Sequence, residues 1–238
     1  MTKAWRALFG FVLVGLTATV VTDSSRPHRI DNDQRAVAIA TLPCETNLQA
    51  TSSGFLVDDE LVVTVAHAVF ESQDFAVRDV SGLWHRASIE HLDLGRDLAV
   101  LRVKGLRATP ARSGEAAVDD RVRMVEGAAS GTAAGSITRR VNVRTNVVGS
   151  EETAVRAGYE LALEIEPGDS GAAVVDDDGR LVAIVFARST RREAVTWSTS
   201  VAEVGLVLGL GDIPEWQCDP AFEAELDLTP PEQEQLAG

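Results

Sequence analysis

Three residue types that together can perform nucleophilic chemistry stand in this chain in the order His67, Asp97, Ser170. A serine hydroxyl is a poor nucleophile until a base removes its proton. Histidine is the side chain that most often acts as such a base, and an aspartate can orient it and stabilise its charged form. The sequence therefore contains the parts of an acyl-transfer site, provided that the fold brings them together.

Each of the three residues also has an ordinary structural interpretation. A Gly-x-Ser-Gly string such as 168–171 can be a surface turn. A histidine that follows an apolar strand, as His67 does, is commonly a core residue, and an aspartate before a strand, as Asp97 is, is commonly a turn residue. The chemical interpretation depends on all three occurring together and in order.

The serine lies in a turn that glycine makes unusually tight. Gly168 and Gly171 let the backbone curl closely around the hydroxyl of Ser170. In such a curl the N–H groups of Gly168 and Ser170 can converge on one point, as stabilisation of an oxyanion requires. We therefore expect Gly168 and Ser170 to form an oxyanion hole.

Short runs rich in valine, threonine and other small residues recur between turn signals, a pattern typical of strands. We therefore expect strands to position these residues. The folded part is expected to begin at 36–42, and the first half predicts strands at 51–57, 61–65, 75–80, 84–90 and 98–103. After the loop-like stretch 104–121, the second half predicts strands at 121–125, 132–137, 140–148, 160–165, 172–175, 180–187 and 193–199, and then a short helix at 201–208.

Four blocks resemble the chymotrypsin-like (trypsin-fold) serine proteases, and in particular their HtrA-like bacterial branch. The blocks are Ser-Gly-Phe-Leu-Val at 53–57, Val-Thr-Val-Ala-His at 63–67, Asp-Leu-Ala-Val-Leu at 97–101 and Glu-Pro-Gly-Asp-Ser-Gly at 166–171. The resemblance covers roughly residues 36–210. It implies an all-β fold of two six-stranded antiparallel β-barrels with a short C-terminal helix. The first barrel would span about 36–105 and the second about 119–210.

The resemblance implies a serine endopeptidase that hydrolyses peptide bonds through an acyl-enzyme, with Ser170 as nucleophile, His67 as general base and Asp97 as orienting acid. The alternative is a catalytically silent protease fold that serves as an extracytoplasmic binding module. A non-enzymatic secreted β-protein would leave three ordered motifs to coincidence. The expected partner is a protein or peptide substrate.

The same resemblance places the substrate. It implies that Ile184, Val185, Phe186 and Ala187 pair with the substrate backbone as an added strand. It puts Glu164, six residues before the nucleophile, at the base of the side-chain pocket, where a carboxylate favours arginine or lysine. A one-residue shift would instead turn Glu164 toward solvent. If Asp169 is buried, we expect an arginine as its partner, because an unpaired buried charge is costly.

Composition narrows the class further. The chain has 238 residues, 45% hydrophobic, which is enough for a real core. Its net charge of −14 argues against nucleic acid and anionic lipid as partners. No cluster of cysteine and histidine has metal-ligand spacing, and we expect neither a metal nor another cofactor.

The N-terminus predicts export. Lys3 and Arg6 precede the uncharged run 7–21, an arrangement typical of a signal peptide. Residues 1–22 are then either cleaved or kept as a membrane anchor, a buried core helix being the structural alternative. We expect a linker at 23–35, a protease domain at 36–218 and an acidic mobile tail at 219–238. The location would be extracytoplasmic, that is periplasmic, in the cell envelope or secreted.

The two cysteines, Cys44 and Cys218, lie near the two ends of the expected domain. In an exported protein a lone pair is most simply a disulfide, and two separate buried thiols are the alternative. One disulfide that ties these two ends is also a feature of actinobacterial membrane-anchored periplasmic serine proteases linked to acid resistance, which the chain resembles. This chain differs from them in having a single N-terminal apolar segment.

Overall fold

The computed structural model describes residues 32–44, 46, 48–127, 131–207, 216, 218, 226 and 228. All of them belong to the second of the two units into which the chain divides, residues 31–238. The predicted export segment 1–22, most of the predicted linker 23–35 and most of the predicted tail 219–238 lie outside the described residues. Among the helices of the described residues, none is long and apolar enough to cross a membrane.

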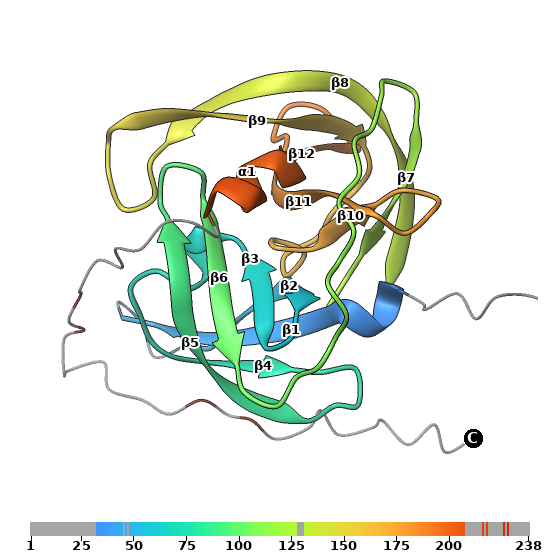
Figure 1. Ribbon diagram of the computed structural model, residues 1–238. Coiled ribbons are helices and arrows are strands. Elements are labelled where there is room, and N and C mark those ends of the chain that lie inside the picture. The colour runs from blue at the N-terminus through green and yellow to red at the C-terminus, as the bar shows by residue number, and fades with distance from the viewer. Residues whose placement is uncertain are drawn as a thin grey trace, which may run out of the picture. The chain divides into compact units, whose positions relative to one another are not determined.

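The first six strands close into an antiparallel barrel in the order β1-β2-β3-β6-β5-β4 (Figure 1). The strands are β1 (Ala36–Pro43), β2 (Ala50–Asp58), β3 (Leu61–Thr64), β4 (Ser72–Arg78), β5 (Trp84–Asp93) and β6 (Leu98–Val103). Closure pairs each of the six strands with two neighbours, so the barrel has no free edge strand.

The next six strands close a second barrel in the order β10-β11-β12-β9-β8-β7. They are β7 (Arg121–Val125), β8 (Thr132–Asn146), β9 (Thr153–Ala162), β10 (Ala173–Val175), β11 (Leu181–Arg188) and β12 (Val195–Ser200). The short helix α1 (Val201–Val207) follows, in contact with β5 and β6 of the first barrel and with β9, β11 and β12 of the second (Figure 1). The predicted fold of two six-stranded barrels with a C-terminal helix is confirmed.

Alternating side chains of the strands supply three separate apolar clusters. On β6, Ala99 and Leu101 point into the first barrel, whereas Leu98 and Val100 join a cluster between the barrels. That interface cluster also contains Ile184 of the second barrel, and the second barrel has its own interior cluster. Because both faces of these strands are buried, their sequences are continuous apolar runs.

Three predicted strands of the second barrel differ from the structure. The stretches 132–137 and 140–148 form one continuous strand, β8, which shifts register between Ile137 and Arg139 instead of ending there. The strand predicted at 160–165 is β9, which begins at Thr153 and ends at Ala162. Its first half was missed because alternating polar residues such as Arg156 do not look like a buried strand.

The folded part also begins before the predicted boundary at residue 36. Residues Asn32–Arg35 form a short 3-10 helix, η1, that leads directly into β1. Arg35 is buried, and its guanidinium donates hydrogen bonds to the carbonyl of Leu56 and to the hydroxyl of Thr109. The last four residues of the predicted linker are therefore part of the structure.

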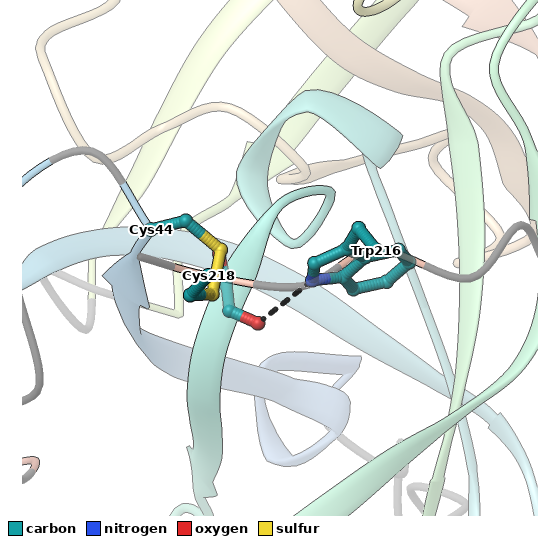
Figure 2. Close-up of a disulfide and its surroundings, with 4 residues drawn as sticks. Cys44, Trp216 and Cys218 are labelled. Carbon is teal, nitrogen blue, oxygen red and sulfur yellow. Dashed lines mark hydrogen bonds between the residues drawn. A yellow bond between two sulfur atoms is a disulfide. The ribbon is translucent and has the colours of Figure 1, made fainter. Parts of the chain in front are cut away.

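A disulfide joins Cys44, just after β1, to Cys218, as predicted (Figure 2). Trp216 lies beside it, where its indole N–H donates to the carbonyl of Ser72 at 3.2 Å and its ring packs edge-on against Phe70. These contacts hold residues 216 and 218 against the segment that follows β3. The sequence separation of the two bonded cysteines is 174.

We expect removal of the disulfide to lower the free energy of unfolding by about 2–5 kcal/mol, because a long closed loop restricts the unfolded chain. The change is Cys44→Ser combined with Cys218→Ser, measured by thermal and denaturant unfolding. Reductant should destabilise the wild-type protein by a similar amount and leave the double variant unaffected. Equal stability of wild type and double variant would contradict this role of the disulfide.

Candidate active site

His67 and Asp97 meet at one end of the first barrel. His67 lies in the 3-10 turn η2 (Ala66–Ala68) that follows β3, and Asp97 directly precedes β6. The Nδ1–H of His67 lies 3.0 and 2.9 Å from the two carboxylate oxygens of Asp97, and the backbone N–H of His67 donates to Oδ1 at 2.9 Å. Because Nδ1 carries the proton, Nε2 is left to accept one.

The two members of this pair differ in exposure. The side chain of Asp97 is 6% exposed, whereas that of His67 is 40% exposed. Asp97 holds a left-handed backbone conformation, with φ of 53°, which is uncommon for a residue other than glycine. A buried carboxylate that contacts the imidazole through both of its oxygens, in a strained turn, can orient a ring that still reaches solvent or substrate.

The serine loop turns tightly at two glycines. Gly168 and Gly171 have φ of 108° and 89°, values that favour glycine. Within the described part of the chain, the N–H groups of Gly168 and Ser170 donate no hydrogen bond, whereas the neighbouring N–H of Asp169 donates to the carbonyl of Glu166. Two free N–H groups beside the Ser170 hydroxyl can stabilise an oxyanion.

Ser53 on β2 ties this loop to the first barrel. Its N–H donates to the carbonyl of Ser170 at 2.8 Å, and its hydroxyl donates to the carbonyl of Gly168 at 3.0 Å. Its own carbonyl accepts the hydroxyl of Thr64, on the strand that leads to His67. A Cβ on Gly171 would lie 1.9 Å from that carbonyl, so only glycine permits this approach. Sequence reasoning missed Ser53, and only its place in the Ser-Gly-Phe block hinted at it.

The serine loop is thus bonded to Ser53 of β2, and the same residue is bonded to Thr64 of β3, the strand that precedes His67. Among the described residues no hydrogen bond joins the imidazole of His67 to the hydroxyl of Ser170. Contacts between catalytic groups are commonly loose before substrate binds and tighten in the complex. The arrangement supplies a base, an oriented carboxylate, a hydroxyl and two free N–H groups at one junction.

The expectation that buried Asp169 pairs with an arginine was wrong. Asp169 is 6% exposed, and its carboxylate accepts the backbone N–H of Glu166 at 2.7 Å. Burial raises the pKa of Asp169, and the nearby carboxylate of Glu166 raises it further. Burial also raises the pKa of Glu126, with Asp169 and Glu166 adding to the effect. Three carboxylates therefore gather beside the serine loop, where a backbone N–H takes the place of the expected cation.

We expect Asp169→Asn to stabilise the protein at neutral pH by about 1 kcal/mol, because the amide still accepts the Glu166 N–H without an ionised group. The pKa of Asp169 is raised on folding, so the stability linked to it is full at low pH and is lost as pH rises through the folded pKa. The gain in melting temperature should therefore fade toward about pH 4. Glu151→Gln, on an exposed turn, is the control, and a lower melting temperature for Asp169→Asn at neutral pH would contradict the interpretation.

The residues predicted to pair with substrate divide into two groups. The N–H and C=O of Val185 bond to Ala172 and Gly171, and Ile184 pairs in register with residues on both neighbouring strands. Their backbone groups are therefore used within the barrel, which corrects the prediction for these two residues. Phe186 and Ala187 lie beyond the end of β10, where β11 pairs only with β12.

A pocket of about 300 Å³ lies between the segment before the serine loop and the hairpin that joins β11 to β12. Glu164 lines it, but the side chain is exposed, whereas its neighbours Leu163 and Ile165 are buried in the second barrel. Glu164 therefore belongs to the wall of the pocket and not to a buried base. Arg188 and Arg191 line the same pocket, so its charge is mixed.

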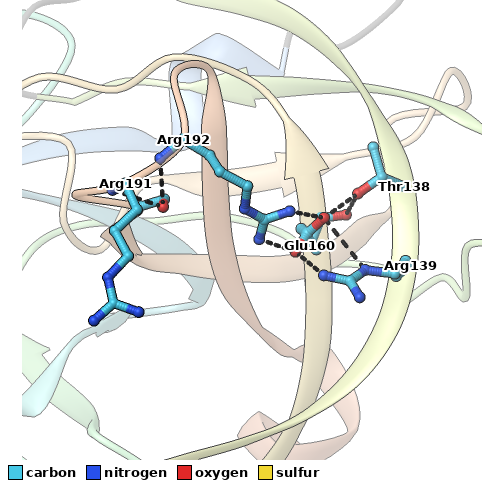
Figure 3. A network of polar contacts seen from close by, with 6 residues as sticks. Thr138, Arg139, Glu160, Arg191 and Arg192 are labelled. Atoms are coloured by element: carbon cyan, nitrogen blue, oxygen red, sulfur yellow. Dashed lines mark hydrogen bonds and ion pairs between the residues drawn. The ribbon is translucent and has the colours of Figure 1, made fainter.

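Glu160 on β9 anchors that hairpin (Figure 3). Its carboxylate accepts hydrogen bonds from Arg192 of the hairpin, from Arg139 of β8 and from the hydroxyl of Thr138. The backbone N–H of Arg192 also donates to the hydroxyl of Ser189, which tightens the turn. Hydrogen bonds from Arg192 and Arg139 lower the pKa of Glu160 to about 2, although its side chain is only 5% exposed.

We expect Glu160→Gln to lower the free energy of unfolding at neutral pH by about 1–2 kcal/mol, because the variant loses the ionised partner of both arginines. The effect stays this small because both arginines remain partly in water, which screens their attraction to Glu160. The folded pKa is depressed, so this stability exists above the unfolded pKa of about 4.3 and is lost as pH falls toward about 2. Unfolding measured from neutral to acid pH should show the difference from wild type shrinking over that window. A difference that stays constant, or one matched by the exposed control Glu151→Gln, would count against the ionic anchor.

No group of three or more histidine, cysteine, aspartate or glutamate side chains among the described residues has an arrangement that could hold a metal ion. Asp97 and His67 come from the first barrel and Ser170 comes from the second, so the site exists only where the barrels meet.

Comparison with known proteins agrees with the fold. The curated serine protease Rv3671c of Mycobacterium tuberculosis is 27% identical over 180 residues, which are 71% of this chain and 41% of the relative. The chain thus spans about two fifths of that relative's length. The crystal structure of the Rv3671c protease from M. tuberculosis in its active form has a TM-score of 0.70 at 22% identity, covering 78% of this chain and 85% of the other.

The structure of the HtrA-type protease AlgWS227A with tripeptide has a TM-score of 0.62 at 18% identity, covering 74% of this chain and 59% of the other. At these identities the likeness describes the fold. The predicted resemblance to chymotrypsin-like and HtrA-type proteases is confirmed. The sequence profile of the family described as Trypsin-like peptidase domain matches residues 52–184, a range that includes His67, Asp97 and Ser170. Because this match covers more than half of the chain, the chain belongs to the trypsin-like peptidase domain family of serine proteases.

Proposed function

We propose that this chain is an extracytoplasmic serine endopeptidase in which Ser170, His67 and Asp97 form the catalytic triad. The observation that carries the proposal is the orientation of the His67 imidazole by both carboxylate oxygens of Asp97, beside a serine loop with two free N–H groups. The family match adds that serine proteases share this stretch of chain. Neither finding favours a silent binding module.

In the proposed reaction the Ser170 hydroxyl attacks the carbonyl carbon of a peptide bond while Nε2 of His67 takes its proton. The carbonyl becomes an oxyanion, which the N–H groups of Gly168 and Ser170 stabilise. Each such hydrogen bond lowers the barrier by about 3–4 kcal/mol in related sites. Asp97 stabilises the imidazolium that forms and keeps the ring in place.

The second half of the reaction reuses the same groups. The His67 imidazolium gives its proton to the departing amine, the C–N bond breaks, and Ser170 is left as an ester of the acyl fragment. A water molecule then attacks this ester while His67 takes its proton. His67 passes that proton to the Ser170 oxygen as the ester bond breaks, which releases the acid product and free Ser170. The neutral ring that ends the cycle is the form that began it.

Substrate backbone is proposed to bind along β11 from Phe186 onward, where no strand of the barrel covers the edge beyond β10. An extended peptide can add there as a further strand. A contact between Glu164 and the substrate side chain stays a prediction, and the arginines of the same wall weaken the expected preference for basic side chains. Protein or peptide is the proposed substrate class.

Two observations support a location outside the cytoplasm. The Cys44–Cys218 disulfide is of a kind that persists in oxidising compartments and is rare in the cytoplasm. The uncharged run 7–21 behind Lys3 and Arg6 is typical of an export signal. We propose periplasmic, cell-envelope or secreted placement, with residues 1–22 either removed or kept as an anchor.

We expect Ser170→Ala to lower peptidase activity by at least about 10⁴-fold, because the variant lacks the nucleophile. The melting temperature should not change, because the substitution removes only one oxygen atom. A fluorophosphonate probe should label wild type at Ser170 and leave Ser170→Ala unlabelled. His67→Ala should be similarly inactive, and the double variant no worse, since the two groups act as a unit.

The control is Ser113→Ala, which removes an exposed serine hydroxyl and should keep full labelling and activity. Wild-type protein that is folded and disulfide-bonded but is not labelled would support the silent binding module instead. Full peptidase activity of Ser170→Ala would exclude the proposed nucleophile.

A further inference from the structure

Arg156 is a buried arginine that reaches the triad carboxylate from the opposite barrel. It stands on β9 of the second barrel and is 3% exposed. Its Nη1 lies 3.4 Å from Oδ2 of Asp97 and donates to the carbonyl of Arg96 at 2.6 Å. Oδ2 is also one of the two oxygens that His67 contacts, so the Asp97 carboxylate interacts with both basic side chains.

The surroundings of Arg156 hold it in this position. Its guanidinium lies over the ring of Phe186, 3.9 Å from the ring centroid, which is a favourable cation–π distance. Its Nε is buried and has no hydrogen-bond partner among the described residues. A buried guanidinium with one unsatisfied N–H is costly for stability, so its retention needs an explanation.

The other charged groups of this junction are already paired with one another. Arg96 forms ion pairs with Asp93 and with Glu203 of α1. Glu203 also accepts the backbone N–H of Ala157, the residue that follows Arg156. Among the described residues, Asp97 therefore faces two basic side chains, His67 and Arg156, while Asp93, Arg96 and Glu203 complete the charged surroundings.

We propose that Arg156 is a positioning residue that fixes Asp97 across the barrel interface and, through its charge, keeps His67 in the neutral form that acts as base to a lower pH. The proposal rests on the proposed function, since it concerns the same triad. It adds a residue of the second barrel to the His67–Asp97 pair, which otherwise lies wholly in the first.

The charge of Arg156 acts on the pair of His67 and Asp97 in a definite direction. A negative carboxylate beside an imidazole favours protonation of the ring, and a positive charge on the far side of the carboxylate offsets part of that attraction. The pair of His67 and Asp97 then binds its shared proton less readily, whichever group carries it. Loss of the Arg156 charge should let the pair bind a proton at a higher pH.

The protonation of Arg156 itself fits this role. Burial lowers the pKa of Arg156, and the charge of Asp97 acts in the opposite direction and favours the charged form. Arginine ordinarily titrates far above neutral pH, so the guanidinium stays charged over the working range of a histidine base. A fixed charge at this place biases the triad without titrating with it.

The test replaces Arg156 by methionine, which keeps an unbranched apolar side chain against Phe186, and by lysine, which keeps the charge. For Arg156→Met we expect the acid limb of the pH profile of kcat/KM to move up by about one pH unit. For Arg156→Lys we expect the acid limb to stay near its wild-type position, even if kcat falls because the shorter side chain holds Asp97 less firmly.

Arg96→Met is the matched control. It removes an equal charge from the same junction, but the Arg96 side chain pairs with Asp93 and Glu203 and leaves the contact between Arg156 and Asp97 in place. Its acid limb should move clearly less than that of Arg156→Met. Equal displacement in both variants would show a general charge effect and overturn the specific role of Arg156.

A second readout does not depend on peptidase activity. In the Ser170→Ala background, NMR titration of the His67 imidazole nitrogens should show protonation at a higher pH when Arg156 is methionine. An unchanged His67 titration in folded Arg156→Met would refute the proposal, whether or not the chain cleaves peptides. If Arg156→Met does not fold, an acid limb displaced by about one unit in Arg156→Lys would equally refute it, because the charge is still present.

Discussion

The hydrogen bonds between the Asp97 carboxylate and His67 are the interaction on which the active-site arrangement depends. Asp97 fixes both the ring and the backbone N–H of His67, so one buried side chain sets the position of the whole 3-10 turn. Hydrogen-bond donors surround that carboxylate and hold it in place. Arg156 supplies one of them from the second barrel, and this makes the geometry of the pair sensitive to how the barrels meet.

The complementary constraint acts on the serine loop. Each barrel closes on itself, so strand pairing alone does not fix one barrel against the other. Ser53 bridges them through its backbone and its hydroxyl, and Gly171 allows the approach because it has no Cβ. Beneath these polar ties lies an apolar cluster with members from both barrels and from α1. The cluster contributes most of the attraction, whereas the hydrogen bonds determine the register of Ser170 relative to His67.

The residues that sequence reasoning found and the ones it missed differ in a physical respect. His67, Asp97 and Ser170 lie in short local patterns of turn and strand residues, and such patterns are visible in one stretch of chain. The contacts of Ser53 and Arg156 depend on partners about 60 to 120 residues away, which no local pattern reveals. The start of β9 was missed for the same reason, because Arg156 is polar but buried. The arginine expected for Asp169 was wrong because a backbone N–H, which every sequence position can offer, satisfies the carboxylate instead.

Charged side chains are buried in this protein chiefly where the chemistry or its supports require them. Asp97 and Arg156 lie at the proposed triad, Asp169 lies within the serine loop, and Glu160 anchors the hairpin beside the pocket. Hydrogen bonds from arginines favour the charged form of Glu160, whereas burial disfavours the charged forms of Asp169 and Arg156. Three apolar clusters can offset that cost, since burial of their side chains dominates the free energy of folding. The stability of the barrels therefore permits charged side chains to be buried where the barrels meet, and fixed charges and dipoles are what a preorganised site needs.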